Sequence, residues 1–150
     1  MNDSSSALPL SSETAATLRV AHLQIVQSVI ARMSAYSASV KNFAITIVAG
    51  MLAFYSQRPD DRIFLFTALS VAALLLLDAH YLRLEKAFRA QYERIRLLPL
   101  SSPTDFAIEC AASDKPTMAS VACSWSVSTF YVPLLAGLLA LYSVLKAWPL

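Results

Sequence analysis

The feature that most constrains this chain is a run of 28 residues without a charged side chain, from Met118 to Leu145. A helix needs about 20 apolar residues to cross a bilayer, so this run is long enough to do so. Two shorter apolar runs precede it, Val40 to Tyr55 and Ile63 to Leu77. A chain of 150 residues with 57% apolar content has too little polar surface to cover three such helices in a soluble fold. The sequence therefore predicts an all-α membrane protein with three transmembrane helices, at about 40–57, 63–81 and 124–146.

The second predicted span continues into a charged amphipathic helix that reaches Arg96, with no Gly or Pro to interrupt it. Beyond Asp78 the apolar residues recur at the spacing of one helix face, at Tyr81, Leu84, Phe88, Tyr92 and Ile95. The first helix has a similar apolar seam before it enters the membrane, at Leu23, Val26, Ile30, Met33, Ser37 and Val40. We expect the two seams to meet in a cytoplasmic antiparallel helical hairpin, a stalk of residues 13–39 and 82–97.

A short turn, SQRPDDR from Ser56 to Arg62, joins the first two helices. Pro59 ends the first helix, and Asp60 or Asp61 can cap the second. Because the connection is short, the two helices must be antiparallel neighbours. Counting outward from the turn places Lys41 near Asp78, and it sets three further neighbours: Lys41 with Tyr81, Arg32 with Arg89 and Ala90, and Ile25 with Leu97.

Two segments do not read as long helices. Residues 1–12, MNDSSSALPLSS, are Ser-rich and lack the basic and apolar regions of a signal peptide, which predicts a disordered leader before a single membrane domain of residues 13–150. Residues 98–117 contain three prolines and several small polar residues, which predicts a cytoplasmic loop. Loops of this length often carry binding or gating functions.

The basic residues orient the chain. Nine of the twelve Lys and Arg residues flank the predicted cytoplasmic sides of the spans, and three lie in the short turn or after the third span. Cytoplasmic loops of membrane proteins carry an excess of Lys and Arg. We therefore expect a bacterial inner-membrane protein with a cytoplasmic N-terminus and a periplasmic C-terminus. The net charge of +2 is too small to predict nucleic-acid binding.

Small residues recur in the first and third spans. Such faces let membrane helices approach closely. Packing within one subunit and packing between subunits explain them equally well, and a homo-oligomer is the expected state. The helix-packing candidates are Ala49, Gly50 and Ala53 in the first span and Ala136, Gly137 and Ala140 in the third.

No catalytic motif is visible. The sequence lacks a Gly-rich phosphate loop, an HExxH motif and a CxxC pair, and its two histidines lie on different helices. Cys110 and Cys123 are 13 residues apart, which is not a metal-ligand spacing, and we expect both to be reduced. We therefore predict that the protein is not an enzyme and that it has no catalytic residue, no metal and no cofactor.

Asp78 is the most informative residue, because an ionisable group at the end of a Leu run needs a partner or water. Two readings remain open. Asp78 pairs with Lys41 across the hairpin and marks the membrane interface, or Asp78 and His80 line the cytoplasmic mouth of an oligomeric pore. Lys41, Asp78 and His80 are thus the gating or pore-mouth candidates.

Charged residues also follow Asp78 along the second helix. Glu85 and Arg89 form a favourable i, i+4 pair, a pattern more typical of a solvated face than of a site. Arg83 and Arg89, with Lys86 and Arg94, would suit lipid headgroups or a nucleotide-like anion.

Three stretches carry a resemblance: HLQIVQSVIARM from His22 to Met33, LDAHYLRLEKAFRAQYERIR from Leu77 to Arg96, and SWSVSTFYVPLL from Ser124 to Leu135. Together they resemble a family of small bacterial integral membrane proteins with a motif close to L-D-A-x-Y-L-R-x-E-x-x-F. His80 stands where that motif would have an aromatic residue. The positions that match are His22, Gln27, Arg32, Asp78, Tyr81, Arg83, Glu85 and Phe88.

Small helical membrane proteins of this kind resemble effectors of bacterial antiphage defence systems. The resemblance implies an inner-membrane effector that oligomerises and permeabilises the membrane when a cytoplasmic sensor protein or a nucleotide-like messenger triggers it. The alternative is a non-conducting anchor in the lipid bilayer that recruits a soluble partner through its stalk. Under either hypothesis the signal- or partner-binding candidates are His22, Gln27, Arg32, Tyr81, Arg83, Glu85 and Arg89.

Overall fold

The computed structural model describes residues 11–99, 102, 106–108 and 115–147. The predicted leader lies almost wholly outside the described residues, and so does Cys110. Within the described residues the protein is all-α, with four helices and no strand.

The first two helices follow the sequence closely. Helix α1 (Ser12–Gln57) is a single helix of 46 residues. Its N-cap is Ser11, whose hydroxyl accepts a hydrogen bond of 3.2 Å from the backbone N–H of Thr14. Helix α2 (Asp61–Leu97) has 37 residues and is capped by Asp60, whose carboxylate accepts a 2.9 Å bond from the N–H of Arg62. The predicted cap at Asp60 is thus confirmed, and α1 ends two residues before Pro59, so the connection is shorter than the predicted turn.

The long uncharged run is divided into two helices. Helix α3 (Met118–Ala122) is a single short turn, and α4 (Trp125–Ala147) is the third long helix. Cys123 and Ser124 lie between them: their backbone N–H groups donate to carbonyls of α3, and the Ser124 carbonyl accepts from the N–H groups of Val127 and Ser128 in α4. Pro133 lies inside α4, and the helix continues on both sides of it.

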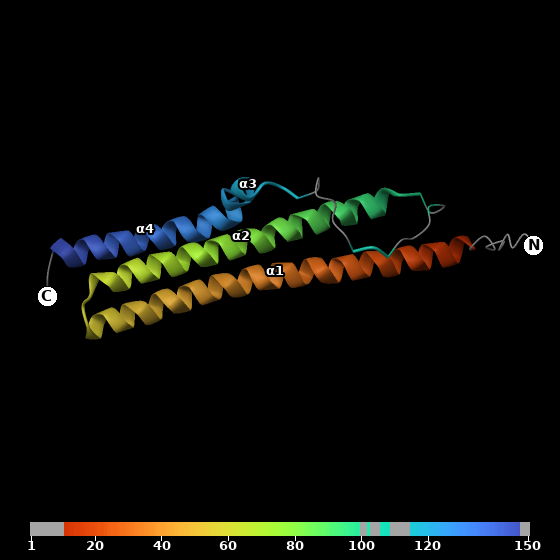
Figure 1. The fold of residues 1–150 in the computed structure, drawn as a ribbon. Coiled ribbons are helices and arrows are strands. Elements are labelled where there is room, and N and C mark those ends of the chain that lie inside the picture. Colours follow the sequence, from red (N-terminus) through yellow and green to blue (C-terminus); the bar gives the residue numbers. More distant parts are fainter. Residues whose placement is uncertain (1–10, 100–101, 103–105, 109–114, 148–150) are drawn as a thin grey trace, which may run out of the picture.

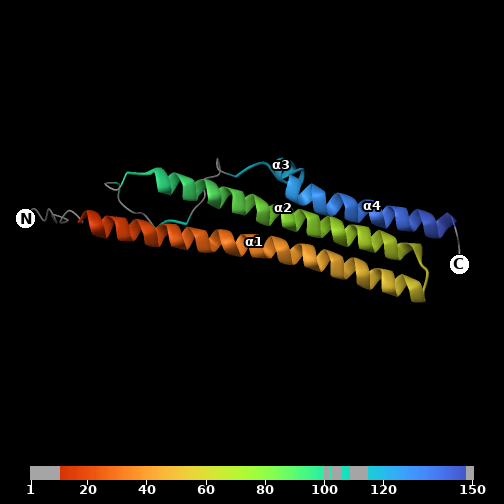
Figure 2. The same cartoon turned by 180° about the vertical axis from the view of Figure 1, so that it is seen from behind.

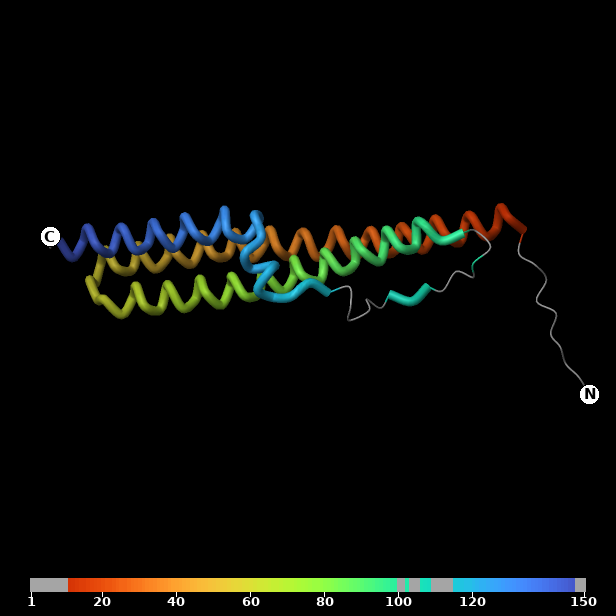
Figure 3. Tube along the Cα trace, turned by 90° about the horizontal axis from the view of Figure 1, so that it is seen from above, coloured from red at the N-terminus to blue at the C-terminus, as the bar shows by residue number. Residues whose placement is uncertain are grey.

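The three long helices lie side by side (Figure 1). Helices α1 and α2 form an antiparallel hairpin, and α4 packs along the half of α2 that is nearest the turn, as the reverse view also shows (Figure 2). The other half of the hairpin extends beyond α4 as a two-helix stalk (Figure 3). At the turn end, Lys146 of α4 forms an exposed ion pair of 2.7 Å with Asp61 of α2.

The core lies where the three long helices meet. It is built around four buried residues, which are Ala44 of α1, Val71 of α2, and Val127 and Tyr131 of α4. All four are almost completely buried, so this cluster fixes the position of α4 on the hairpin.

Both predicted apolar seams are buried or half-buried, including Val26 and Val40 of α1 and Ile95 of α2. At the end of the stalk the long side chain of Arg19 reaches the end of α2, where it donates to the carbonyls of Ile95 and Leu98.

Candidate functional site

A buried ion pair joins α1 and α2 where the stalk meets the apolar spans. The Nζ atom of Lys41 lies 2.7 Å from Oδ2 of Asp78. Ser37, one turn before Lys41, donates its hydroxyl to Oδ1 of Asp78 and accepts a 2.9 Å hydrogen bond from Lys41 Nζ. Asp78 is completely buried, and the side chain of Lys41 is 19% exposed. The predicted Lys41–Asp78 contact is therefore present, and Ser37 completes it.

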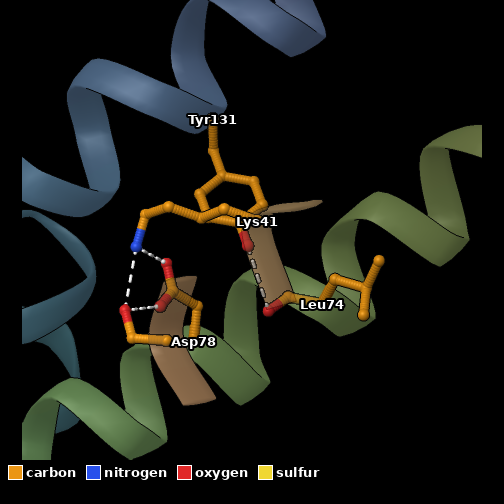
Figure 4. Close-up of polar contacts among 5 residues, drawn as sticks. Lys41, Leu74, Asp78 and Tyr131 are labelled. Atoms are coloured by element: carbon orange, nitrogen blue, oxygen red, sulfur yellow. Dashed lines mark hydrogen bonds and ion pairs between the residues drawn. The ribbon is translucent and has the colours of Figure 1, made fainter. Parts of the chain in front are cut away.

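Tyr131 brings the third helix to this ion pair. Figure 4 shows Tyr131 together with Lys41 and Asp78, with its hydroxyl directed at the backbone of Leu74. The Tyr131 hydroxyl donates to the Leu74 carbonyl at 3.4 Å, which is a long hydrogen bond. The ion pair and the core cluster thus lie side by side, and all three long helices contribute to them.

The contact between Ser37 and Lys41 invites comparison with a Ser-Lys nucleophile pair. In such a pair a neutral lysine takes the hydroxyl proton. Here the ammonium group faces the Asp78 carboxylate, and the Ser37 hydroxyl proton is already donated to that carboxylate. The geometry favours a stabilising contact over nucleophilic chemistry.

His80 lies apart from the ion pair. Its side chain is exposed, whereas Asp78 is buried against α1, so the two do not share a face of this subunit. The His80 ring packs edge-on against Tyr81 at a centroid distance of 6.2 Å. Tyr81 in turn contacts Tyr36 of α1, with ring centroids 5.3 Å apart.

Glu85 and Arg89 form the expected pair, with 2.7 Å between Oε1 and Nη2. Only one partner of the pair lies on a solvated face. The Arg89 side chain is 61% exposed, whereas that of Glu85 is 10% exposed. Arg89 of α2 and Gln27 of α1 line the same open groove of about 320 Å³, together with Ile30, Tyr92 and Glu93.

The remaining candidates are spread along the stalk. Arg32 is exposed on α1. His22 is 4% exposed, and its ring contacts Phe106 with centroids 5.5 Å apart. Its Nε2 atom has no hydrogen-bond partner among the described residues. Arg83 donates from Nε to the carbonyl of Pro116 at 2.7 Å. The signal-binding candidates therefore do not form one site.

The six small residues of the helix-packing candidates all face outward. Each is exposed on its helix. A Cβ atom added to Gly50 or Gly137 would meet no atom within 4 Å. Packing within one subunit therefore does not explain the two glycines.

Sequence reasoning missed three residues of these contacts. Ser37 was assigned only to the apolar seam, and Tyr131 had no assigned role. Arg19 was counted only as a basic residue, yet it is 7% exposed and donates four hydrogen bonds to backbone carbonyls. The one signal in the sequence for these contacts was Ser37, because a polar residue at a position of an apolar seam needs a hydrogen-bond partner.

These observations define the class of protein. Three helices, α1, α2 and α4, are long and apolar enough to cross a membrane, and the first two pack antiparallel. This architecture indicates a membrane location. No group of three or more His, Cys, Asp or Glu residues in the described ranges is placed to hold a metal ion.

Comparisons with protein-family models, curated proteins and solved structures gave no match to this chain. The resemblance to small bacterial membrane proteins therefore stays a prediction.

Proposed function

We propose that this protein is a bacterial inner-membrane effector that oligomerises and permeabilises the membrane in response to a cytoplasmic signal, in antiphage defence. The observation that carries the proposal is the position of the Lys41–Asp78 pair. It lies at the junction between the stalk and the apolar spans, with the Asp78 side chain completely buried and the Lys41 side chain largely so.

A buried charge pair at this place suits a switch. Breaking a buried pair by separating its partners leaves an uncompensated charge and costs about 3–5 kcal/mol. A free-energy change of that size shifts a two-state equilibrium by a factor of about one hundred or more. Because α1 and α2 run unbroken past the pair, a movement of the stalk acts directly on it.

The stalk offers a place where a signal can act. The groove lined by Gln27 and Arg89 is open, has both polar and apolar walls, and is formed by both helices of the hairpin. A ligand or protein segment that binds there contacts α1 and α2 at once. It would thereby change the free energy of one arrangement of the two helices relative to another.

Self-association is supported by the outward position of the small residues. Small faces on the lipid-exposed surface of α1 and α4 let helices of neighbouring subunits approach closely. A path for ions then forms between subunits, because the space between the three helices of one subunit is filled by the core cluster.

The test is expression of the full chain in bacteria that carry a membrane-potential dye. The effector is expected to depolarise the cells, and Asp78→Asn should change that depolarisation at matched expression. Glu13→Gln, an exposed carboxylate in the first turn of α1 that lies outside the groove, is the control and should leave depolarisation unchanged. A silent wild type is repeated with the neighbouring genes from its native locus, which supply the trigger. If the potential then still does not change, the protein is the non-conducting anchor.

A further inference from the structure

Arg19 of α1 holds the chain where it leaves α2. Its Nη1 atom donates to the carbonyls of Ile95 at 2.9 Å and Leu98 at 3.1 Å. Its Nη2 atom donates to Pro99 and Ser102, both at 3.3 Å. The last carbonyls of a helix have no partner within the helix. A guanidinium group satisfies them and interacts favourably with the negative end of the helix dipole.

Two more side chains of the stalk hold the same connection farther on. Gln91 is 7% exposed and donates from Nε2 to the carbonyl of Ala107 at 3.0 Å. The adjacent Phe106 packs on the ring of His22. Residues 106–108 therefore lie beside both helices of the stalk (Figures 1 and 2).

The third contact is closest to the membrane. Arg83 donates from Nε to the carbonyl of Pro116 at 2.7 Å. Pro116 directly precedes Thr117, which caps α3, and α4 follows after two residues. Arg83 also lies five positions beyond Asp78 on α2. Arg83 thus attaches the residues that lead into α3 and α4 to α2, slightly more than one helical turn from Asp78.

We propose that these three contacts, the carbonyl tethers of Arg19, Gln91 and Arg83, hold the described parts of the connection (98–99, 102, 106–108 and 115–117) on the stalk. We further infer that the Arg83 tether passes a movement of the stalk to α4. The transmission part of this inference rests on the proposed function. The tethering part does not, because it follows from the contacts alone. Buried or part-buried hydrogen bonds from a charged donor are stronger than neutral ones, which suits Arg19 and Arg83 to this role.

Distances between spin labels test the tethers in the full chain in lipid nanodiscs. Native cysteines are replaced by serine, and labelled subunits are diluted with unlabelled ones so that only distances within one subunit are measured. One label pair, at Ala90 and Ser120, reports on the Arg83 tether. A second pair, at Gln24 and Ile108, reports on the Gln91 tether. All four positions are exposed.

Each pair should give one narrow distance distribution in the otherwise unchanged protein. Arg83→Gln should broaden the distribution of the 90/120 pair and leave the 24/108 pair narrow, and Gln91→Leu should do the reverse. Arg96→Gln, whose ion pair with Glu93 is exposed, is the control and should change neither. A narrow 90/120 distribution in Arg83→Gln overturns the Arg83 tether.

Transmission is read in the depolarisation assay. If the tether passes stalk movement to α4, Arg83→Gln alters depolarisation and Arg96→Gln does not. Altered distances together with unaltered depolarisation would overturn transmission while leaving the tether in place. A wild type that never depolarises, even with its neighbouring genes, overturns the proposed function instead.

Discussion

The carboxylate of Asp78 and the ammonium group of Lys41 lie 2.7 Å apart but differ in their access to water. Asp78 is completely buried, whereas the Lys41 side chain is 19% exposed. A long lysine side chain can turn its charge toward the membrane surface, but a buried aspartate has no such freedom. Loss of the Lys41 cation should therefore destabilise the protein more than loss of the Asp78 charge.

This inequality predicts the result of a double-mutant cycle. Lys41→Met leaves the Asp78 carboxylate buried without its cation and should destabilise the folded protein by about 3 kcal/mol. Asp78→Asn keeps an acceptor for Ser37 and should cost less, about 1–2 kcal/mol. The double variant should cost less than the sum, because both changes remove one interaction. Unfolding in mixed micelles with increasing fractions of denaturing detergent measures all three.

Glu93→Gln is the control for that cycle. Its ion pair with Arg96 is exposed on both sides, and exposed pairs contribute little to stability. Fully additive effects of the Lys41 and Asp78 substitutions would show that the two residues do not interact. Asp78 would then be a marker of the membrane interface and no longer a candidate for the switch.

Two substitutions of Tyr131 distinguish what its hydroxyl group contributes to stability from what its ring contributes. The side chain is 1% exposed and packs in the core cluster with Ala44, Val71 and Val127. Tyr131→Phe keeps the ring and loses only a long hydrogen bond, so the cost should stay below about 1 kcal/mol. Tyr131→Ala empties the core and should cost about 3–5 kcal/mol. If both variants lose the same stability in the unfolding assay, the hydroxyl group matters more than the packing.

A substitution of Gly137 distinguishes an effect on the association of subunits from an effect on the folding of one subunit. The residue faces outward with open space around it, so Gly137→Leu should not destabilise a single subunit. It should weaken self-association, because a large side chain keeps neighbouring helices apart. Sedimentation in detergent measures the oligomer, and Leu139→Phe, which adds bulk at an exposed position on a different side of the same helix, is the control. A wild type that is strictly monomeric would contradict both the oligomer and the pore.

Cysteine labelling tests the orientation in the membrane. In a background without native cysteines, Asp60→Cys in the short turn should react with a membrane-impermeant maleimide added outside the inner membrane. Val20→Cys, exposed on the stalk, should react only after the membrane is opened. This outcome follows from the excess of basic residues on the stalk side. Labelling at position 60 only from the cytoplasm would reverse the orientation.

Much of the fold could be predicted because it depends on local patterns. The apolar spacing predicted both seams, and Ser11 and Asp60 cap their helices as residues of their type do. The contact between Lys41 and Asp78 was predictable because a short turn makes the two helices antiparallel neighbours, so counting outward from the turn brings these positions together.

The contacts that were not predicted depend on backbone carbonyl groups, which every residue has. Arg19, Gln91 and Arg83 bind backbone carbonyls, and a carbonyl acceptor leaves no mark in the sequence. The position of Tyr131 depends on how α4 lies across the hairpin, which no local pattern reports.

The unbroken length of α1 gives the stalk the mechanics of a lever. The part of α1 before Val40 is about 40 Å long at a rise of 1.5 Å per residue. A tilt of about 5° at the bilayer surface therefore moves the far end by roughly 3.5 Å, and a displacement of that size at the far end produces the same tilt at the spans. Work is conserved along a rigid arm, so a weak force far from the membrane becomes a strong torque on the helices inside it.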